Sequence, residues 1–246
     1  MVRWCAERNR AVGAVISLST AWALAQAWYS DRLEPEWRRR TASEAQAVFT
    51  GLGLTECLLA PGCTPFTPSV VRQAMIVLET ERLSLRRMSL DDAPFIIELL
   101  NDPAFLRFVG DKGVRTAEDA RQYILTGPMD SYERHGFGLW VVELKGSRLP
   151  IGICGLLKRE ILTDVDIGFA FLPGHRSKGY AFESAAAVMD YGRTVLGLRR
   201  VVAITDDENT GSHRVLEKIG MTFERMIRLS EGHPEIRLLA SEVSGA

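Results

Sequence analysis

Residues 164–205 read as a strand, a helix and a second strand, and this unit restricts the fold more than any other feature. Asp164–Leu172 alternates along its length, Phe182–Leu196 has apolar residues at helical spacing, and Arg200–Thr205 is rich in β-branched residues. A connecting helix of this length lets the two strands run parallel in one sheet. The chain therefore needs a sheet with at least one parallel pair and a helix packed on it.

The flanking sequence predicts a mostly antiparallel sheet around this crossover. Ser89 and Thr116 each stand three residues before an acid, a pattern typical of helix starts, and the two helices extend to about Leu100 and Leu125. The remaining predictions are a helix at 212–218 and strands at 76–86, 137–145, 149–158, 224–229 and 235–240. This order predicts the α/β (α+β) class, with a single crossover.

Composition changes abruptly near residue 75. Residues 1–74 hold four of the five tryptophans, three of the four cysteines and none of the lysines, with a net charge of +2 from eight Arg and six acids. The remainder carries 22 basic and 25 acidic residues, a net charge of −3. Residues 61–68 are rich in Pro and turn formers. We therefore expect a domain at 75–246, preceded by an extension of unlike composition at 1–74.

The extension has three interpretations. Ala11–Leu24 is uncharged, follows three arginines and ends near a small-x-small pattern, as a secretory signal or anchor would. Its Ala and Leu content also fits an ordinary helix. The third interpretation is a misassigned start, with Met75 as the true first residue. We favour the third, because an ordered pattern begins at Met75.

The loop before the predicted crossover helix, at 173–181, contains the pattern Arg-x-x-Gly-x-Ala. Backbone N–H groups in such a loop, together with the partial positive charge of a helix N-terminus, favour an anion. Gly179 lets the backbone approach a ligand closely, and Arg176 and Lys178 can add charge-assisted contacts to a phosphate. Taken alone, the same pattern fits an ordinary turn with a helix-capping glycine.

A second motif, Asn-x-x-Ser-x-Arg-Val-Leu-Glu-Lys-x-Gly, occupies residues 209–220. Alone, it fits a helix capped by Asn209 or Ser212 whose apolar side chains face the core. The two motifs in this order resemble the GNAT superfamily of acyl-CoA N-acyltransferases. The Asp-x-Asp-Ile-Gly-Phe strand and the Thr-Glu-Arg-Leu-x-Leu-Arg opening at 80–86 are similar to its RimJ/RimL-type branch. The resemblance covers about residues 75–240 and implies a mixed central sheet with helices on both faces.

The resemblance also implies acetyl-CoA as co-substrate. It would lie where the strand bearing Asp166 and the strand at 201–205 splay apart, with its pyrophosphate on the loop at 176–181. A backbone N–H near Phe169 would polarise the thioester carbonyl. The residues expected to bind it are Ile167, Gly168, Phe169, Arg176, Ser177, Lys178, Gly179, Tyr180, Ala181, Asn209 and Ser212.

The acceptor amine would attack the thioester directly and needs a base for its proton. Glu160 and Asp166 are the candidates, each with the alternative of an ordinary solvated carboxylate. Many relatives carry a tyrosine after the second motif as general acid, but here the sequence is Met221-Thr222-Phe223, which leaves Ser212 as a substitute. The missing tyrosine motivates an alternative function, a non-catalytic acyl-CoA-binding sensor or interaction domain.

The remaining expectations concern partners. The acceptor is a primary amine: a protein or peptide N-terminus, an amino acid or a small amine. Four scattered histidines and no CxxC pair predict no metal, and Cys154 in an apolar strand is expected in the core. The near-neutral charge of −1 gives no general attraction to nucleic acid. We expect a cytoplasmic protein without membrane association, as monomer or homodimer.

Overall fold

The computed structural model describes residues 75–230 and 234–242, so the interpretations of residues 1–74 lie outside the described residues. The strands are β1 (Ile76–Glu79), β2 (Leu83–Arg86), β3 (Leu139–Leu144), β4 (Pro150–Leu157), β5 (Val165–Phe171), β6 (Arg200–Thr205), β7 (Thr222–Ile227) and β8 (Ile236–Glu242). The helices are α5 (Ala93–Leu100), α6 (Pro103–Phe108), α7 (Ala117–Ile124), α8 (Asp130–His135), α9 (Tyr180–Thr194) and α10 (Thr210–Lys218). Three short helical turns are η1 (Leu90–Asp92), η2 (Leu125–Met129) and η3 (Pro173–His175).

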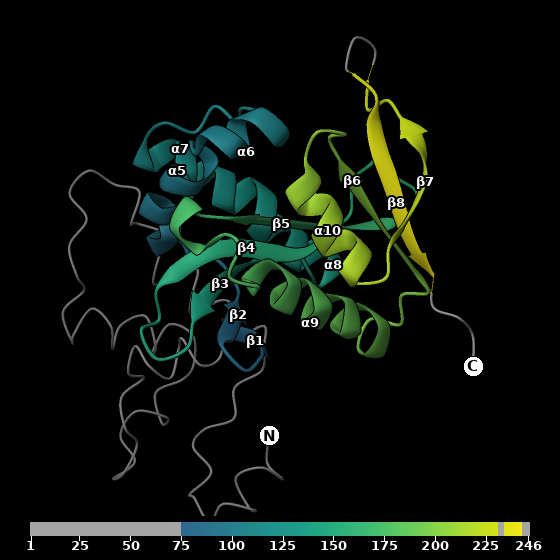
Figure 1. Cartoon of the computed structure of the whole chain (residues 1–246). Helices are drawn as coiled ribbons and strands as arrows, with labels where there is room; N and C mark the ends of the chain where they lie inside the picture. Colours follow the sequence, from purple (N-terminus) through teal and green to yellow (C-terminus); the bar gives the residue numbers. More distant parts are fainter. Residues whose placement is uncertain (1–74, 231–233, 243–246) are drawn as a thin grey trace, which may run out of the picture. The chain divides into compact units, whose positions relative to one another are not determined.

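The eight strands of the described residues form one sheet in the order β1-β2-β3-β4-β5-β6-β8-β7 (Figure 1). All neighbouring strands are antiparallel except β5 and β6, which α9 connects and which run parallel. The predicted mixed sheet with its one crossover is therefore confirmed.

Residues 76–86 form a hairpin, so the prediction of one continuous strand was wrong. The N–H of Thr80 donates to the carbonyl of Leu83 at 2.9 Å, and the N–H of Leu83 donates to the Thr80 hydroxyl at 3.0 Å. These bonds close a turn between β1 and β2. The alternation of Leu83 and Leu85 belongs to β2 alone, and the polar residues before it make the turn.

The two predicted helices between β2 and β3 begin and end as expected, and three unpredicted helical elements, α6, η2 and α8, follow them. Asp102 follows α5 and also starts α6, since its carboxylate accepts from the N–H groups of Ala104 and Phe105 at 3.1 and 3.2 Å. The capping box of Thr116 opens α7 as expected. The sequence did not predict η2 and α8, because Pro128 inside η2 normally ends a helix.

Helices cover both faces of the sheet, as expected (Figure 1). On one face α9 packs against β4 and β5, and its core includes Trp140, Cys154, Leu156, Ile167 and Val188. On the other face α5, α6 and α7 pack over Val141 and Ile153. Trp140 stacks edge-on against Tyr191 of α9 with ring centroids 5.3 Å apart. The alternating strands thus place successive side chains into two separate cores.

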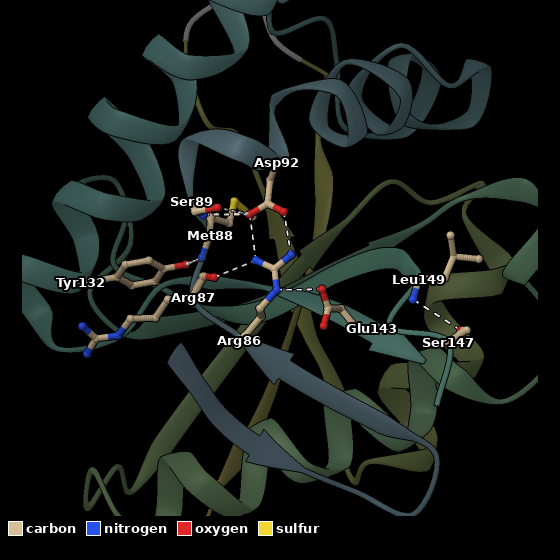
Figure 2. Close-up of polar contacts among 9 residues, drawn as sticks. All are labelled: Arg86, Arg87, Met88, Ser89, Asp92, Tyr132, Glu143, Ser147 and Leu149. Carbon is tan, nitrogen blue, oxygen red and sulfur yellow. Dashed lines mark hydrogen bonds and ion pairs between the residues drawn. The ribbon is translucent and has the colours of Figure 1, made fainter. Parts of the chain in front are cut away.

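A buried ion network links β2, β3 and η1 (Figure 2). Arg86 is only 4% exposed and donates from Nη1 and Nη2 to Asp92 at 2.8 and 2.6 Å, and from Nε to Glu143 at 2.8 Å. Asp92 also accepts from the N–H of Ser89 at 2.7 Å. Burial acts to lower the pKa of Arg86, but the two carboxylates outweigh it and raise the pKa, so the guanidinium stays charged.

Candidate functional site

The candidate site begins where β5 and β6 separate. The two strands pair only at Val165–Val201 and Asp166–Val202, although β5 continues to Phe171 and β6 to Thr205. Beyond Asp166, β5 still pairs with β4 on its other side through every residue to Phe171. One edge of residues 167–171 therefore faces away from any strand in the described residues. This is the divergence that the sequence analysis expected.

The strand at this edge carries three of the predicted cofactor-binding residues. Ile167 is buried in the α9-side core, and Phe169 packs partly against it. Gly168 faces the other way, because a Cβ there would lie 2.8 Å from Cδ1 of Leu157. The side chains of Ile167 and Phe169 belong to the α9-side core, so an extended ligand along this edge would contact the main chain.

The loop from β5 to α9 contains two left-handed residues directly before the helix start. Ser177 has a φ of 60° and Gly179 a φ of 85°, both in the left-handed region. Left-handed residues in such a turn direct neighbouring N–H groups to one side. The first helical bond of α9 runs from the N–H of Glu183 to the carbonyl of Gly179, and no side chain caps the helix start. The N–H groups of Tyr180 and Ala181 therefore precede the first bonded donor of the helix.

Arg176 has a different environment from the one expected. Its Nε donates to the carbonyl of Phe171 at 2.8 Å, and its Nη2 forms an ion pair with Asp102, the cap of α6. The guanidinium thereby connects the loop to the helices on the opposite face of the sheet from α9. The backbone N–H of Arg176 also donates to the carbonyl of Pro173 at 3.3 Å, so the guanidinium and the N–H of Arg176 both have partners. The exposed side chain of Lys178 has no such partner among the described residues.

Tyr180 and the β1–β2 turn meet at the start of α9. The guanidinium of Arg82 lies over the Tyr180 ring, 4.6 Å from its centroid, and its Nη1 donates to the carbonyl of Lys178 at 3.1 Å. The ring of His175 lies near that of Tyr180, with centroids 6.4 Å apart. In the sequence, Arg82 is marked only as part of the opening motif at 80–86. Its position beside the loop depends on a contact across 96 residues, which no local pattern indicates.

The second motif forms the start of α10. The side chain of Asn209 caps this helix by accepting from the N–H of Ser212 at 3.1 Å. Ser212 is partly buried. His213 Nε2 lies 3.0 Å from the carbonyl of Asp206, which holds the preceding turn. The helix-capping interpretation of Asn209 is therefore correct, and a ligand contact by Asn209 or Ser212 stays a prediction.

Asp166 lies at the point of divergence and is 1% exposed. Its Oδ2 forms an ion pair with Nε of Arg159 at 3.0 Å, while its buried Oδ1 has no hydrogen-bond partner in the described residues. Burial raises the pKa of Asp166, and the charge and hydrogen bond of Arg159 only partly oppose this. The structure thus places Asp166 at the divergence, with one buried oxygen that has no hydrogen-bond partner among the described residues.

Glu160 is exposed in the turn after β4, and it has no ion pair or hydrogen bond to the described residues. Residues 221–223, where the family resemblance implies a tyrosine, contain no phenol. Met221 is buried there and Phe223 is exposed.

Cys154 is fully buried, which raises the pKa of its thiol to about 12. A thiol with this pKa is a poor nucleophile at neutral pH, in line with its expected place in the core.

Two structural absences concern the described residues alone. Within residues 75–230 and 234–242, no three His, Cys, Asp or Glu side chains are grouped so as to hold a metal ion. In the same part of the chain, no helix is both long and apolar enough to cross a membrane.

Comparison with known proteins assigns this arrangement to a family. The sequence model of the acetyltransferase (GNAT) domain matches residues 82–222. YkkB of Bacillus subtilis, an uncharacterised protein, is 32% identical over 154 residues, which cover 61% of this chain and 88% of YkkB. The uncharacterised N-acetyltransferase YnaD of the same organism is 31% identical over 147 residues, covering 60% of this chain and 83% of YnaD. Among solved structures, a GNAT-family acetyltransferase from Bacillus anthracis has a TM-score of 0.57 and 29% identity, covering 67% of this chain and 97% of that one.

Two further relatives have named acceptors. Spermidine N(1)-acetyltransferase of Escherichia coli is 24% identical over 143 residues, 58% of this chain and 74% of that enzyme. An acetyltransferase from Salmonella typhimurium that modifies the N-terminal serine of ribosomal protein L7/L12 has a TM-score of 0.59 at 16% identity, covering 69% and 99% of the two chains. The second likeness is one of fold alone.

Proposed function

The chain belongs to the GNAT acetyltransferase family, and from this premise we propose that it transfers the acetyl group of acetyl-CoA to the nitrogen of a primary amine. The observation that carries the proposal is the divergence of β5 from β6 after Asp166, with the uncapped start of α9 at the end of β5. The divergence exposes a strand edge for an extended thioester, and the helix start supplies donors for its pyrophosphate. Acetyl-CoA is a cytoplasmic metabolite, so we place the activity in the cytoplasm.

In this proposal the reaction is a direct displacement. The amine nitrogen attacks the thioester carbonyl, a C–N bond forms, the C–S bond breaks, and CoA leaves as the thiolate. A backbone N–H near Phe169 polarises the carbonyl oxygen. The strand edge and the loop hold the thioester in place, and positioning of the two reactants supplies much of the rate. No covalent enzyme intermediate is needed, in agreement with the burial of Cys154.

Asp166 is the proposed base for the proton of the attacking amine. Its Oδ1 has no hydrogen-bond partner in the part of the chain that the structure describes, and Asp166 lies at the divergence where the thioester would be held. Its raised pKa makes it a better base than an ordinary carboxylate. Glu160 is exposed, and no hydrogen bond or ion pair within residues 75–230 and 234–242 orients it. We therefore expect Asp166→Asn to lower kcat by about 10²–10⁴-fold and Glu160→Gln to leave it nearly unchanged.

Charges near Asp166 bear on the acceptor. Arg159 forms the ion pair with Asp166, and the charge of Lys158 also acts to lower the pKa of Asp166. Two cations beside the base oppose the approach of a polycation such as spermidine. They favour a peptide N-terminus or an amino acid, in which a single amine reacts.

The test is an acetyl-CoA turnover screen of the full chain that follows release of the CoA thiol. The panel contains peptides with different N-termini, amino acids, simple monoamines and spermidine. We expect turnover with at least one monoamine class and little with spermidine. A protein that binds acetyl-CoA but acetylates no amine would instead support the sensor function, which the absence of a tyrosine at 221–223 motivates. If neither CoA nor acetyl-CoA binds, both functions are excluded.

A further inference from the structure

The β1–β2 turn holds the first turn of α9 by a dense set of polar contacts. One carboxylate oxygen of Glu183, Oε1, accepts from the Thr80 hydroxyl at 2.5 Å and from the N–H of Arg82 at 2.9 Å. The other oxygen, Oε2, accepts from Nε of Arg82 at 2.6 Å. The contacts join positions about 100 residues apart. We call Thr80, Arg82 and Glu183 the hairpin clamp.

The hairpin clamp also contacts the loop at 176–181, where we expect the pyrophosphate to bind. Nη1 of Arg82 donates to the carbonyl of Lys178 at 3.1 Å, and the guanidinium covers the ring of Tyr180. A Cβ at Gly179 would lie 3.2 Å from Nη2 of the same side chain. One arginine therefore contacts or borders three successive loop residues. The Arg82 side chain is 45% exposed, so these contacts lie at the surface of the domain and not in its core.

Glu183 has an unfavourable position for an anion site. It is the fourth residue of α9, one turn from the N–H groups that would bind a pyrophosphate. Burial acts to raise its pKa, but the bonds from Thr80 and Arg82 outweigh burial and lower the pKa, so Glu183 is ionised at neutral pH. A carboxylate at this distance repels a phosphate unless a cation neutralises it.

We propose that Arg82 is a positioning residue for the CoA phosphates, which acts by neutralising Glu183 and by holding that carboxylate on the β1–β2 turn, away from the loop N–H groups. This inference rests on the proposed function. It assigns a role in ligand affinity to the opening motif at 80–86, which the resemblance had treated only as a mark of the branch. In this role Arg82 is not a direct phosphate ligand, because the Nε of Arg82 already donates to Glu183.

The decisive experiment compares acetyl-CoA with S-acetylpantetheine, which carries the same thioester but no phosphate. In the full chain, Arg82→Gln should raise the Kd and KM for acetyl-CoA about tenfold, which corresponds to roughly 1.4 kcal/mol. The kcat should stay within about twofold, and kinetics with S-acetylpantetheine should not change. Arg134→Gln removes an exposed arginine of an ion pair on α8 and is the matched control.

The double variant Arg82→Gln/Glu183→Gln tests the proposed route. If Arg82 acts by neutralising Glu183, removing the carboxylate as well should restore most of the lost affinity for acetyl-CoA. An equally weak double variant would overturn the inference, since Arg82 would then act on the phosphates without Glu183. Unchanged acetyl-CoA affinity in Arg82→Gln would overturn it too, as would an equal loss with S-acetylpantetheine. If the wild-type chain binds no CoA, the proposed function fails instead.

Discussion

Replacing Arg86 by Met tests the buried ion network of Figure 2. Arg86 donates hydrogen bonds to Asp92, to Glu143 and, from Nη1 at 3.0 Å, to the carbonyl of Arg87. The Met side chain fills a similar length but supplies no donor and no charge. The variant therefore keeps two carboxylates of low exposure while it removes the cation between them.

The expected cost follows from that burial. Removing one partner of a buried ion pair typically costs about 3–5 kcal/mol, because the remaining charge stays desolvated. For a domain of this size, each kcal/mol lowers the melting temperature by about 2–4 °C. A loss of about 4 kcal/mol thus predicts a melting temperature lower by about 8–16 °C. Adding Glu143→Gln removes one of the two charges, so the double variant should be more stable than Arg86→Met alone.

The measurements are urea unfolding and thermal unfolding of the wild type, both variants and a control. The control is Arg134→Met, which removes an exposed pair with Asp130 and should cost less than about 1 kcal/mol. A loss below about 1 kcal/mol in Arg86→Met would refute the reasoning, since it would mean that the carboxylates do not depend on their cation. A double variant less stable than Arg86→Met would contradict the charge argument in particular.

Two more predictions concern packing and pH. Gly155→Ala would place a Cβ 2.0 Å from the carbonyl oxygen of Gly138, a backbone atom directly before β3. Because backbone cannot move aside as a flexible side chain can, we expect the free energy of unfolding in urea to fall by about 3 kcal/mol or more. A fall under about 1 kcal/mol would show that the strands can separate there. If Asp166 is the base, it must be deprotonated to act, so kcat/KM should rise with pH through its raised pKa. Arg159→Gln removes a cation that lowers this pKa, so the acidic limb of the pH profile should move to higher pH; a limb that stays in place would argue against Asp166, and Glu160→Gln is the comparison that should not move it.

Most elements were predictable because their signals are local. The capping box of Thr116 and the hairpin between β3 and β4 each depend on residues within a few positions of one another. The same locality produced the errors. No helix was predicted after the one that ends near Leu100, because the role of Asp102 as the cap of α6 looks identical in sequence to a helix stop. The turn at Thr80 was missed because apolar alternation resumes directly after it.

The sequence by itself determined the family and most of the order of strands and helices, and it predicted an anion-binding loop at 176–181. These depend on the spacing of neighbouring residues, which hydrogen bonds across three or four positions translate directly into helix starts and turns. Only the tertiary structure decided which charges meet. Arg176 pairs with Asp102, Arg82 with Glu183 and Arg86 with Glu143, across 57 to 101 residues. Such pairs form only when the sheet brings distant segments together, and an arginine's own neighbours do not reveal which carboxylate will neutralise it.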